Sequence, residues 1–182
     1  MKDFKETLIE LDACKEAIIW AGDKDFKTVY ETCERGDWLL WLYARTNKDD
    51  LRRLTLAKAH CANTVRDLMN DKRSTDAIDI AILFGEGKAT LEQLNAASLA
   101  SYAADAANAA YSSASFAANA ASAANSSASL ADAADAAYYA SSASYTASSL
   151  ASYAAAAQKQ NQQLTADICR KYLPIENFNI NY

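Results

Sequence analysis

CERGDWLLWLYAR, residues 33–45, contains five consecutive apolar residues, two of which are tryptophans. A run of this kind cannot lie entirely on a half-exposed helix face, so it predicts a helix at the centre of the core. We expect Gly36 to end the preceding helix and Asp37 to cap the next one. We also expect the indoles of Trp38 and Trp41 to be buried. The predicted structural core motif is Gly36, Asp37, Trp38, Leu39, Trp41 and Leu42.

The segments on either side of this motif also have helical periodicity. Apolar residues recur at steps of three and four, which predicts amphipathic helices over 3–21, 25–35, 50–70, 74–85 and 160–172. The chain has four glycines and one proline, and it lacks the Asn-Gly and Asp-Gly pairs typical of β-hairpins. The sequence therefore predicts an all-α fold, a multi-helix bundle, with a loosely ordered tail after Pro174.

Residues 96–157 form a tract of low complexity, in which 30 of 62 residues are alanine and 15 are serine. Alanine is the strongest helix former, so this composition predicts ordered helix. As a single helix the tract would be about 93 Å long. The alternative is a helical hairpin that folds back near Asn125–Ser127, and we favour it because a protein of this size needs to cover the large residues of the tract.

Those large residues recur at intervals close to whole helical turns and are expected to form one stripe: Tyr102, Phe116, Leu130, Tyr138, Tyr145 and Tyr153. A helix with only three charged residues cannot keep such a stripe in water. We expect it to pack on the N-terminal helices or on a second copy of the chain. The predicted organisation is thus a helical part with a Trp-rich core (1–95), the Ala/Ser-rich helices (96–157), and a C-terminal helix and tail (158–182).

The charge and the cysteines restrict the possible partners and compartment. The net charge is −5 and the isoelectric point about 4.9, which argues against nucleic acid as a partner. No apolar run has the length of a membrane span, and residues 1–20 lack the apolar core of a secretory signal. The four cysteines are widely spaced, which favours reduced, mostly buried thiols over disulfides or metal ligands: Cys14, Cys33, Cys61 and Cys169. We therefore expect a cytoplasmic protein without membrane contact.

The sequence contains no recognisable catalytic site. His60 is followed by Cys61, but adjacent helical residues point about 100° apart, so we do not expect them to share a metal ion. The clustered acids fit solvated helix faces, and the serines of the Ala/Ser tract have no histidine to activate them. Arg35-Gly36-Asp37 is interpreted as a helix end followed by a helix cap. We expect a protein that is not an enzyme and needs no cofactor or metal.

Several segments resemble a family of bacterial proteins described as immunity proteins. In order they are LDACKEAIIWAG, CERGDWLLWLYAR, AKAHCANTVRDL, the Ala-rich tract after GEGKATLEQL, and ADICRKYLP. The most specific part is Gly-Asp-Trp-Leu-Leu-Trp-Leu at 36–42. The resemblance implies a short helical protein that binds and neutralises a cognate toxin in the producing cell, and it carries no binding residues over to this chain.

Two classes of function remain open. The first is an immunity-like protein that acts by protein–protein contact, which suits an acidic chain facing a basic toxin. The second is a structural or scaffolding protein that forms homo-oligomers through its Ala/Ser helices. The sequence leaves the partner-binding residues unknown in both cases.

Overall fold

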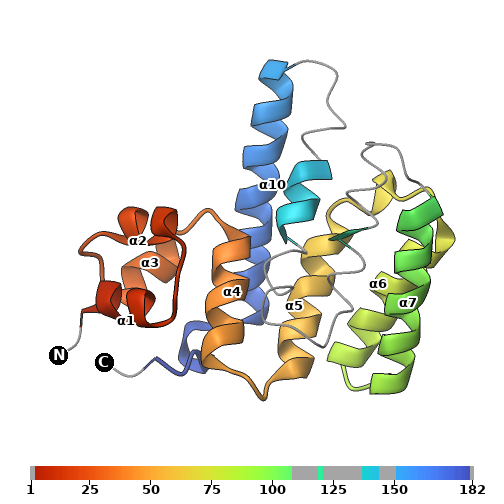
Figure 1. Cartoon of the computed structure of the whole chain (residues 1–182), viewed down its shortest axis with the longest axis horizontal. Helices are drawn as coiled ribbons and strands as arrows, with labels where there is room; N and C mark the ends of the chain where they lie inside the picture. Colours follow the sequence, from red (N-terminus) through yellow and green to blue (C-terminus); the bar gives the residue numbers. More distant parts are fainter. Residues whose placement is uncertain (1–2, 108–118, 121–136, 144–150, 181–182) are drawn as a thin grey trace.

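The computed structural model describes residues 3–107, 119–120, 137–143 and 151–180, and every regular element within them is helical (Figure 1). This confirms the predicted all-α class. The helices form a row, with the short N-terminal helices at one end, α10 and α4 beside them, and α5, α6 and α7 following in order (Figure 1). Within the described residues, no helix is both long and apolar enough to cross a membrane.

The first two helices replace the single helix expected over 3–21. They are α1 (Phe4–Glu10) and α2 (Lys15–Ala21). Between them Asp12 has a φ of 60°, a left-handed conformation that Asp tolerates better than most residues. The prediction of one helix was wrong because this break involves neither glycine nor proline, and the apolar spacing continues across it.

The next two helices show what Gly36 does. Helix α3 is Phe26–Thr32, capped by the Asp25 carboxylate, and α4 is Gly36–Thr46. Gly36 therefore begins a helix instead of ending one, and Asp37 lies in the first turn of α4 rather than at its cap. The glycine is needed for a tertiary contact instead of for a helix end, because a Cβ atom on Gly36 would lie 2.6 Å from the hydroxyl oxygen of Thr165 in α10.

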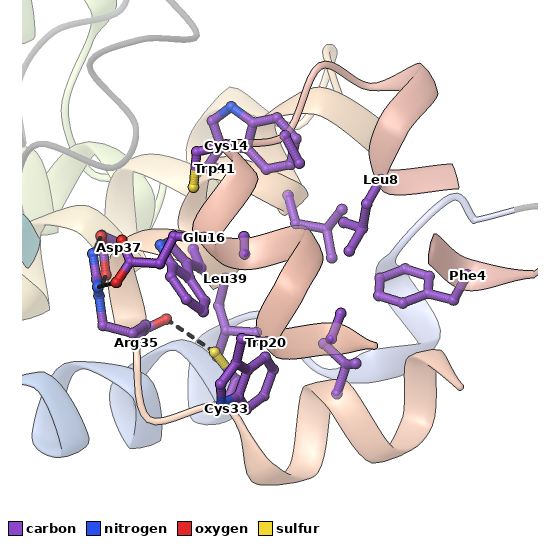
Figure 2. Close-up of a pocket in the computed structure, with 16 residues that line it drawn as sticks. Phe4, Leu8, Cys14, Glu16, Trp20, Cys33, Arg35, Asp37, Leu39 and Trp41 are labelled. Atoms are coloured by element: carbon purple, nitrogen blue, oxygen red, sulfur yellow. Dashed lines mark hydrogen bonds and ion pairs between the residues drawn. The ribbon is translucent and has the colours of Figure 1, made fainter. Parts of the chain in front are cut away.

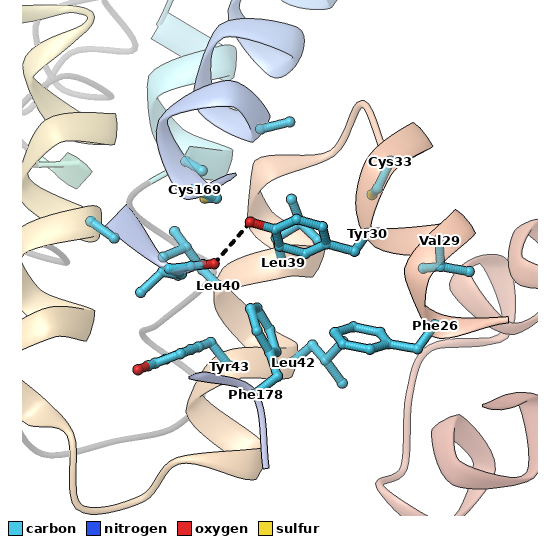
Figure 3. Close-up of a cluster of buried hydrophobic side chains, with 14 of the residues drawn as sticks. Phe26, Val29, Tyr30, Cys33, Leu39, Leu40, Leu42, Tyr43, Cys169 and Phe178 are labelled. Atoms are coloured by element: carbon cyan, nitrogen blue, oxygen red, sulfur yellow. Dashed lines mark hydrogen bonds between the residues drawn. The ribbon is translucent and has the colours of Figure 1, made fainter. Parts of the chain in front are cut away.

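Helix α4 is central, but its tryptophans are not fully buried. Leu39, Leu40 and Tyr43 are at most 2% exposed, whereas Trp38 and Trp41 are only partly buried. The expectation of two buried indoles was wrong. Five apolar residues in a row cover more than one helix face, and here the leucines and Tyr43 occupy the core (Figure 3).

The first core joins α4 to α5 (Leu51–Asn63) and to the C-terminal α10 (Ala151–Tyr172). The Sγ atoms of Cys61 and Cys169 lie 3.9 Å apart inside it, and both thiols are free. The Tyr30 hydroxyl donates a hydrogen bond to the Leu173 carbonyl at 3.1 Å (Figure 3). These contacts attach the C-terminal helix to the N-terminal half of the chain.

The tail expected to be loosely ordered is part of this core. A short 3-10 helix, η2 (Ile175–Asn177), turns the chain back after Pro174. Phe178 is only 7% exposed and its ring packs against Phe26, Tyr30 and Tyr43. The expectation was wrong because the apolar residues of this short segment, which alternate with polar ones, show no helical periodicity.

The second core lies between α5, α6 (Lys72–Gly85) and α7 (Leu91–Ala107). Helix α5 is shorter than the expected 50–70, since a separate 3-10 helix, η1 (Arg66–Leu68), follows it. A capping box precedes α7. The Thr90 hydroxyl oxygen accepts a hydrogen bond from the backbone N–H of Gln93, and the backbone N–H of Thr90 donates one to the side-chain oxygen of Gln93.

The described parts of the Ala/Ser tract are helical, namely α7 up to residue 107, residues 119–120 and 137–143, and the start of α10. Small residues are what these parts bury: Ala120, Ala137, Ala140, Ala143, Ser101 and Ser141. Tyr138, by contrast, is 50% exposed, so the N-terminal helices do not cover it, and its packing on a second copy of the chain stays a prediction. The other stripe side chains, and the choice between one helix and a hairpin, lie outside the described residues. The boundary expected between 157 and 158 falls inside α10.

Candidate binding site

All three tryptophans of the chain line one pocket, between helices α1, α2 and α3 on one side and α4 on the other (Figure 2). The pocket has a volume of about 260 Å³. Most of its wall is apolar and comes from Phe4, Leu8, Ala13, Ala17, Trp20, Ala21, Val29, Trp38, Leu39, Trp41 and Leu42. We call this the three-tryptophan pocket.

The three indoles come from two helices. Trp20 lies in the last turn of α2, and its ring meets Trp38 edge-on at a centroid distance of 5.7 Å. Trp38 and Trp41 are three residues apart in α4 and therefore lie on one helix face. The opposite part of α4, with Leu40 and Tyr43, is buried in the core, which leaves the indole face turned toward the pocket.

A cation from this chain lies over each indole. The Lys24 ammonium lies 4.7 Å from the Trp20 ring. The Arg35 and Arg45 guanidinium carbons lie 4.6 Å and 5.6 Å from the rings of Trp38 and Trp41. Such contacts stabilise a ring orientation without covering the whole ring. The indoles are thus held in place while each still contributes surface to the pocket.

The polar side of the pocket is made by three charged residues. Arg35 forms a bidentate pair with Asp37, at 2.8 Å and 2.6 Å, and this hydrogen bonding raises the pKa of Arg35. Glu16 is 3.9 Å from Arg35, and its side chain is 75% exposed at the rim. Because Arg35 and Asp37 neutralise each other, Glu16 is the one unbalanced charge among the residues that line the pocket, while Lys24 and Arg45 lie over two of the indoles.

Two cysteines also line the pocket, and they differ in exposure. Cys33 is buried, and this desolvation raises the pKa of its thiol to about 11. It is therefore protonated at neutral pH and a poor nucleophile. Cys14 is exposed at the N-cap of α2 and makes no side-chain capping bond. The four cysteines were expected to be reduced and mostly buried; all four are free, and Cys14 is the exposed one.

A second, more polar groove adjoins the pocket. It shares Glu16, Trp20, Arg35 and Trp38 with the pocket and extends to α10 through Ala155, Gln158, Lys159 and Gln162. Glu34 borders this groove, accepts a hydrogen bond from Gln163 at 2.9 Å and lies 3.9 Å from the Lys159 ammonium. The pocket therefore opens onto a wider surface that mixes apolar and charged groups.

His60 and Cys61 serve separate packing roles. The His60 ring stacks on Tyr172 at 4.2 Å with an interplanar angle of 6°, and burial lowers the pKa of His60. Cys61 faces α10, where its Sγ approaches the Thr165 carbonyl at 3.7 Å. In the part of the chain that the structure describes, no three His, Cys, Asp or Glu side chains are grouped to hold a metal ion.

Sequence reasoning found part of this site. The core motif contains Trp38 and Trp41, which were assigned to the interior, and Asp37, which was assigned to a cap. Trp20, Glu16 and Cys14 were missed as members of one site. No spacing along the sequence connects Trp20 with Trp38 and Trp41, because packing between α2 and α4 brings them together.

Comparison with known proteins adds no relative: no family model, no curated protein and no solved structure matches this chain. The resemblance to bacterial immunity proteins stays a prediction.

Proposed function

We propose that this protein binds another protein through the three-tryptophan pocket, and that it is an immunity-like protein that neutralises a cognate bacterial toxin in the cytoplasm. One observation carries the proposal: all three indoles converge on a single concave, largely apolar surface and none of them is fully buried. Tryptophan is the residue type most enriched at the energetic centres of protein interfaces.

The energetics of burial support a partner at this place. Complete burial of a large apolar side chain is worth about 1.5–3 kcal/mol. The core of this chain is filled by leucines and by Tyr43, and the three indoles are only partly buried. They therefore obtain only part of the free energy that complete burial would give. A partner that covers the pocket completes their burial without disturbing the core.

The proposal is tested in two steps: the genes beside this one are examined for a toxin, and a toxin found there is co-expressed with this chain. The wild-type chain is expected to restore growth and to co-purify with the toxin. Trp38→Ala is expected to weaken both, since it removes an indole from the pocket wall. Leu99→Ala is the control, because Leu99 is 72% exposed on α7 and outside the pocket. Equal protection by wild type and Trp38→Ala would contradict the proposal.

The exposed apolar residues Leu99 and Tyr138 favour the second candidate, a self-associating scaffold protein. Both lie on Ala/Ser-rich helix, where small neighbours permit a second helix to approach closely. Light scattering coupled to gel filtration separates the two candidates. An oligomer that Leu99→Lys converts to monomer would support the scaffold, whereas a monomer at all concentrations favours the immunity-like function.

A further inference from the structure

The negative charge of the chain is concentrated in the part that carries the pocket. Residues 1–42 contain ten acidic and six basic residues, a net charge of −4, and residues 43–182 contain thirteen and twelve, a net charge of −1. The pocket-forming helices α1, α2 and α3 lie within the first of these ranges. The part of the chain that forms the pocket therefore carries most of the net negative charge and attracts cations at long range, although Lys24, Arg35 and Arg45 lie over the indoles themselves.

The size of the pocket limits what enters it. Its volume of about 260 Å³ lies near the lower end of the roughly 300–1,000 Å³ typical of small-molecule sites. The apolar wall of indoles, Phe4 and leucines suits one large apolar side chain. Glu16 stands at the rim with an exposed carboxylate that Arg35, already paired with Asp37, only partly compensates.

We propose that the occupant is a basic segment of the partner protein, which inserts one large apolar side chain into the three-tryptophan pocket and places a Lys or Arg beside Glu16. This inference rests on the proposed function and adds the chemistry of the partner. The inserted side chain covers the surface of the indoles that is exposed in the free protein. The positively charged flanking residues are attracted by the net negative charge of residues 1–42.

Synthetic peptides test the proposal on the full chain. The first peptide has one phenylalanine flanked by lysines and arginines, the second has alanine in place of phenylalanine, and the third has glutamates in place of the basic residues. Because all three tryptophans line the pocket, selectively excited indole emission reports its occupancy directly. The first peptide is expected to change the emission in a saturable way. Equal responses to all three peptides, or a response to the acidic peptide alone, would overturn the proposal.

Two charge reversals locate the binding. Glu16→Lys is expected to weaken binding of the first peptide about fivefold. Asp23→Lys makes the same change in charge at an exposed position that lines neither the pocket nor the adjoining groove. It is expected to have a smaller effect, and an equal effect would show attraction by net charge without docking at the rim.

The exposed Cys14 gives a second readout that does not depend on the indoles. It lines the pocket while the other three cysteines are buried, so a thiol reagent should modify it selectively. Bound peptide is expected to slow this labelling, and unchanged labelling at saturation would place the peptide elsewhere and refute the proposal.

The failure of this inference is distinct from failure of the proposed function. If the toxin is neutralised in a Trp38-dependent way but the basic peptide does not bind, the partner chemistry is wrong and the function stands. If the first peptide binds as expected but no protection from a toxin depends on Trp38, the chemistry of the pocket stands and the immunity-like function is wrong. Self-association that covers Cys14 in the absence of peptide would identify a second copy as the occupant and overturn the inference.

Discussion

Gly36 at the start of α4 packs directly against Thr165 of α10, so closely that a Cβ atom on Gly36 would lie 2.7 Å from the carbonyl carbon of Thr165. No side-chain rotation relieves a clash with a backbone atom. The close approach of α4 to α10 at this point therefore requires a residue without a side chain. The same contact brings Cys169 Sγ within 3.4 Å of the Gly36 carbonyl oxygen.

Gly36→Ala is expected to lower the free energy of unfolding by about 1–3 kcal/mol, a typical cost of overpacking. Urea denaturation measures the change. Helix propensity alone predicts the opposite sign, because alanine is better than glycine in a helix by about 1 kcal/mol. A variant as stable as wild type, or more stable, would contradict the close contact between α4 and α10.

Phe178→Ala is expected to lower the free energy of unfolding by about 3–5 kcal/mol. The ring of Phe178 lies 5.0 Å from that of Tyr43 and 5.3 Å from that of Phe26, so its removal opens a cavity between α3 and α4. Leu164→Ala is the matched control, since Leu164 is 47% exposed, and its effect should stay within about 0.5 kcal/mol. Equal effects of the two variants would mean that the C-terminal tail does not pack.

The two kinds of residue in α4 should respond differently to truncation. Leu40 is fully buried, and Leu40→Ala is expected to cost about 2–5 kcal/mol. Trp41 is only partly buried, so Trp41→Ala should cost less in spite of its larger side chain. Denaturation curves give both values. In addition, iodide should quench the indole emission of the folded protein, and the absence of quenching would contradict the open pocket.

The folded protein should lose stability as the pH falls through the ordinary pKa of histidine. Burial, together with the nearby Lys171 charge, lowers the pKa of His60 below its usual 6.5. Between the lowered pKa and 6.5 the unfolded chain binds more protons at His60 than the folded chain does, so the free energy of unfolding decreases as the pH decreases.

His60→Phe isolates this effect, because phenylalanine keeps a ring against Tyr172 but does not titrate. Denaturation at a series of pH values, from about 8 to about 5, compares it with wild type around the histidine pKa. The stability of wild type relative to the variant should fall toward the acidic end. A constant or rising difference would show that His60 is protonated freely in the folded state.

Local chemistry alone was sufficient for the class of the fold and for several of its boundaries. The capping box at Thr90 and Gln93 forms as expected, and the stop at Pro174 ends α10 close to the predicted residue. These features depend on residues a few positions apart. Their geometry follows from helix propensity and side-chain capping, and both can be predicted from the residue types at neighbouring positions.

The tertiary structure decided what each apolar residue contacts. The run Trp38 to Leu42 predicts a helix that is apolar on more than one face, but it does not predict which face contacts α10 and which contacts α2. That choice depends on shape: Gly36 admits Thr165, Phe178 returns to fill the space beside Tyr43, and the bulkier indoles are left at the pocket with Trp20. The sequence determined that these residues would be helical and apolar. Only packing between segments more than a hundred residues apart separated the core from the candidate binding surface. The physical reason is that periodicity along a single helix does not encode how side chains of different volume fit together in space.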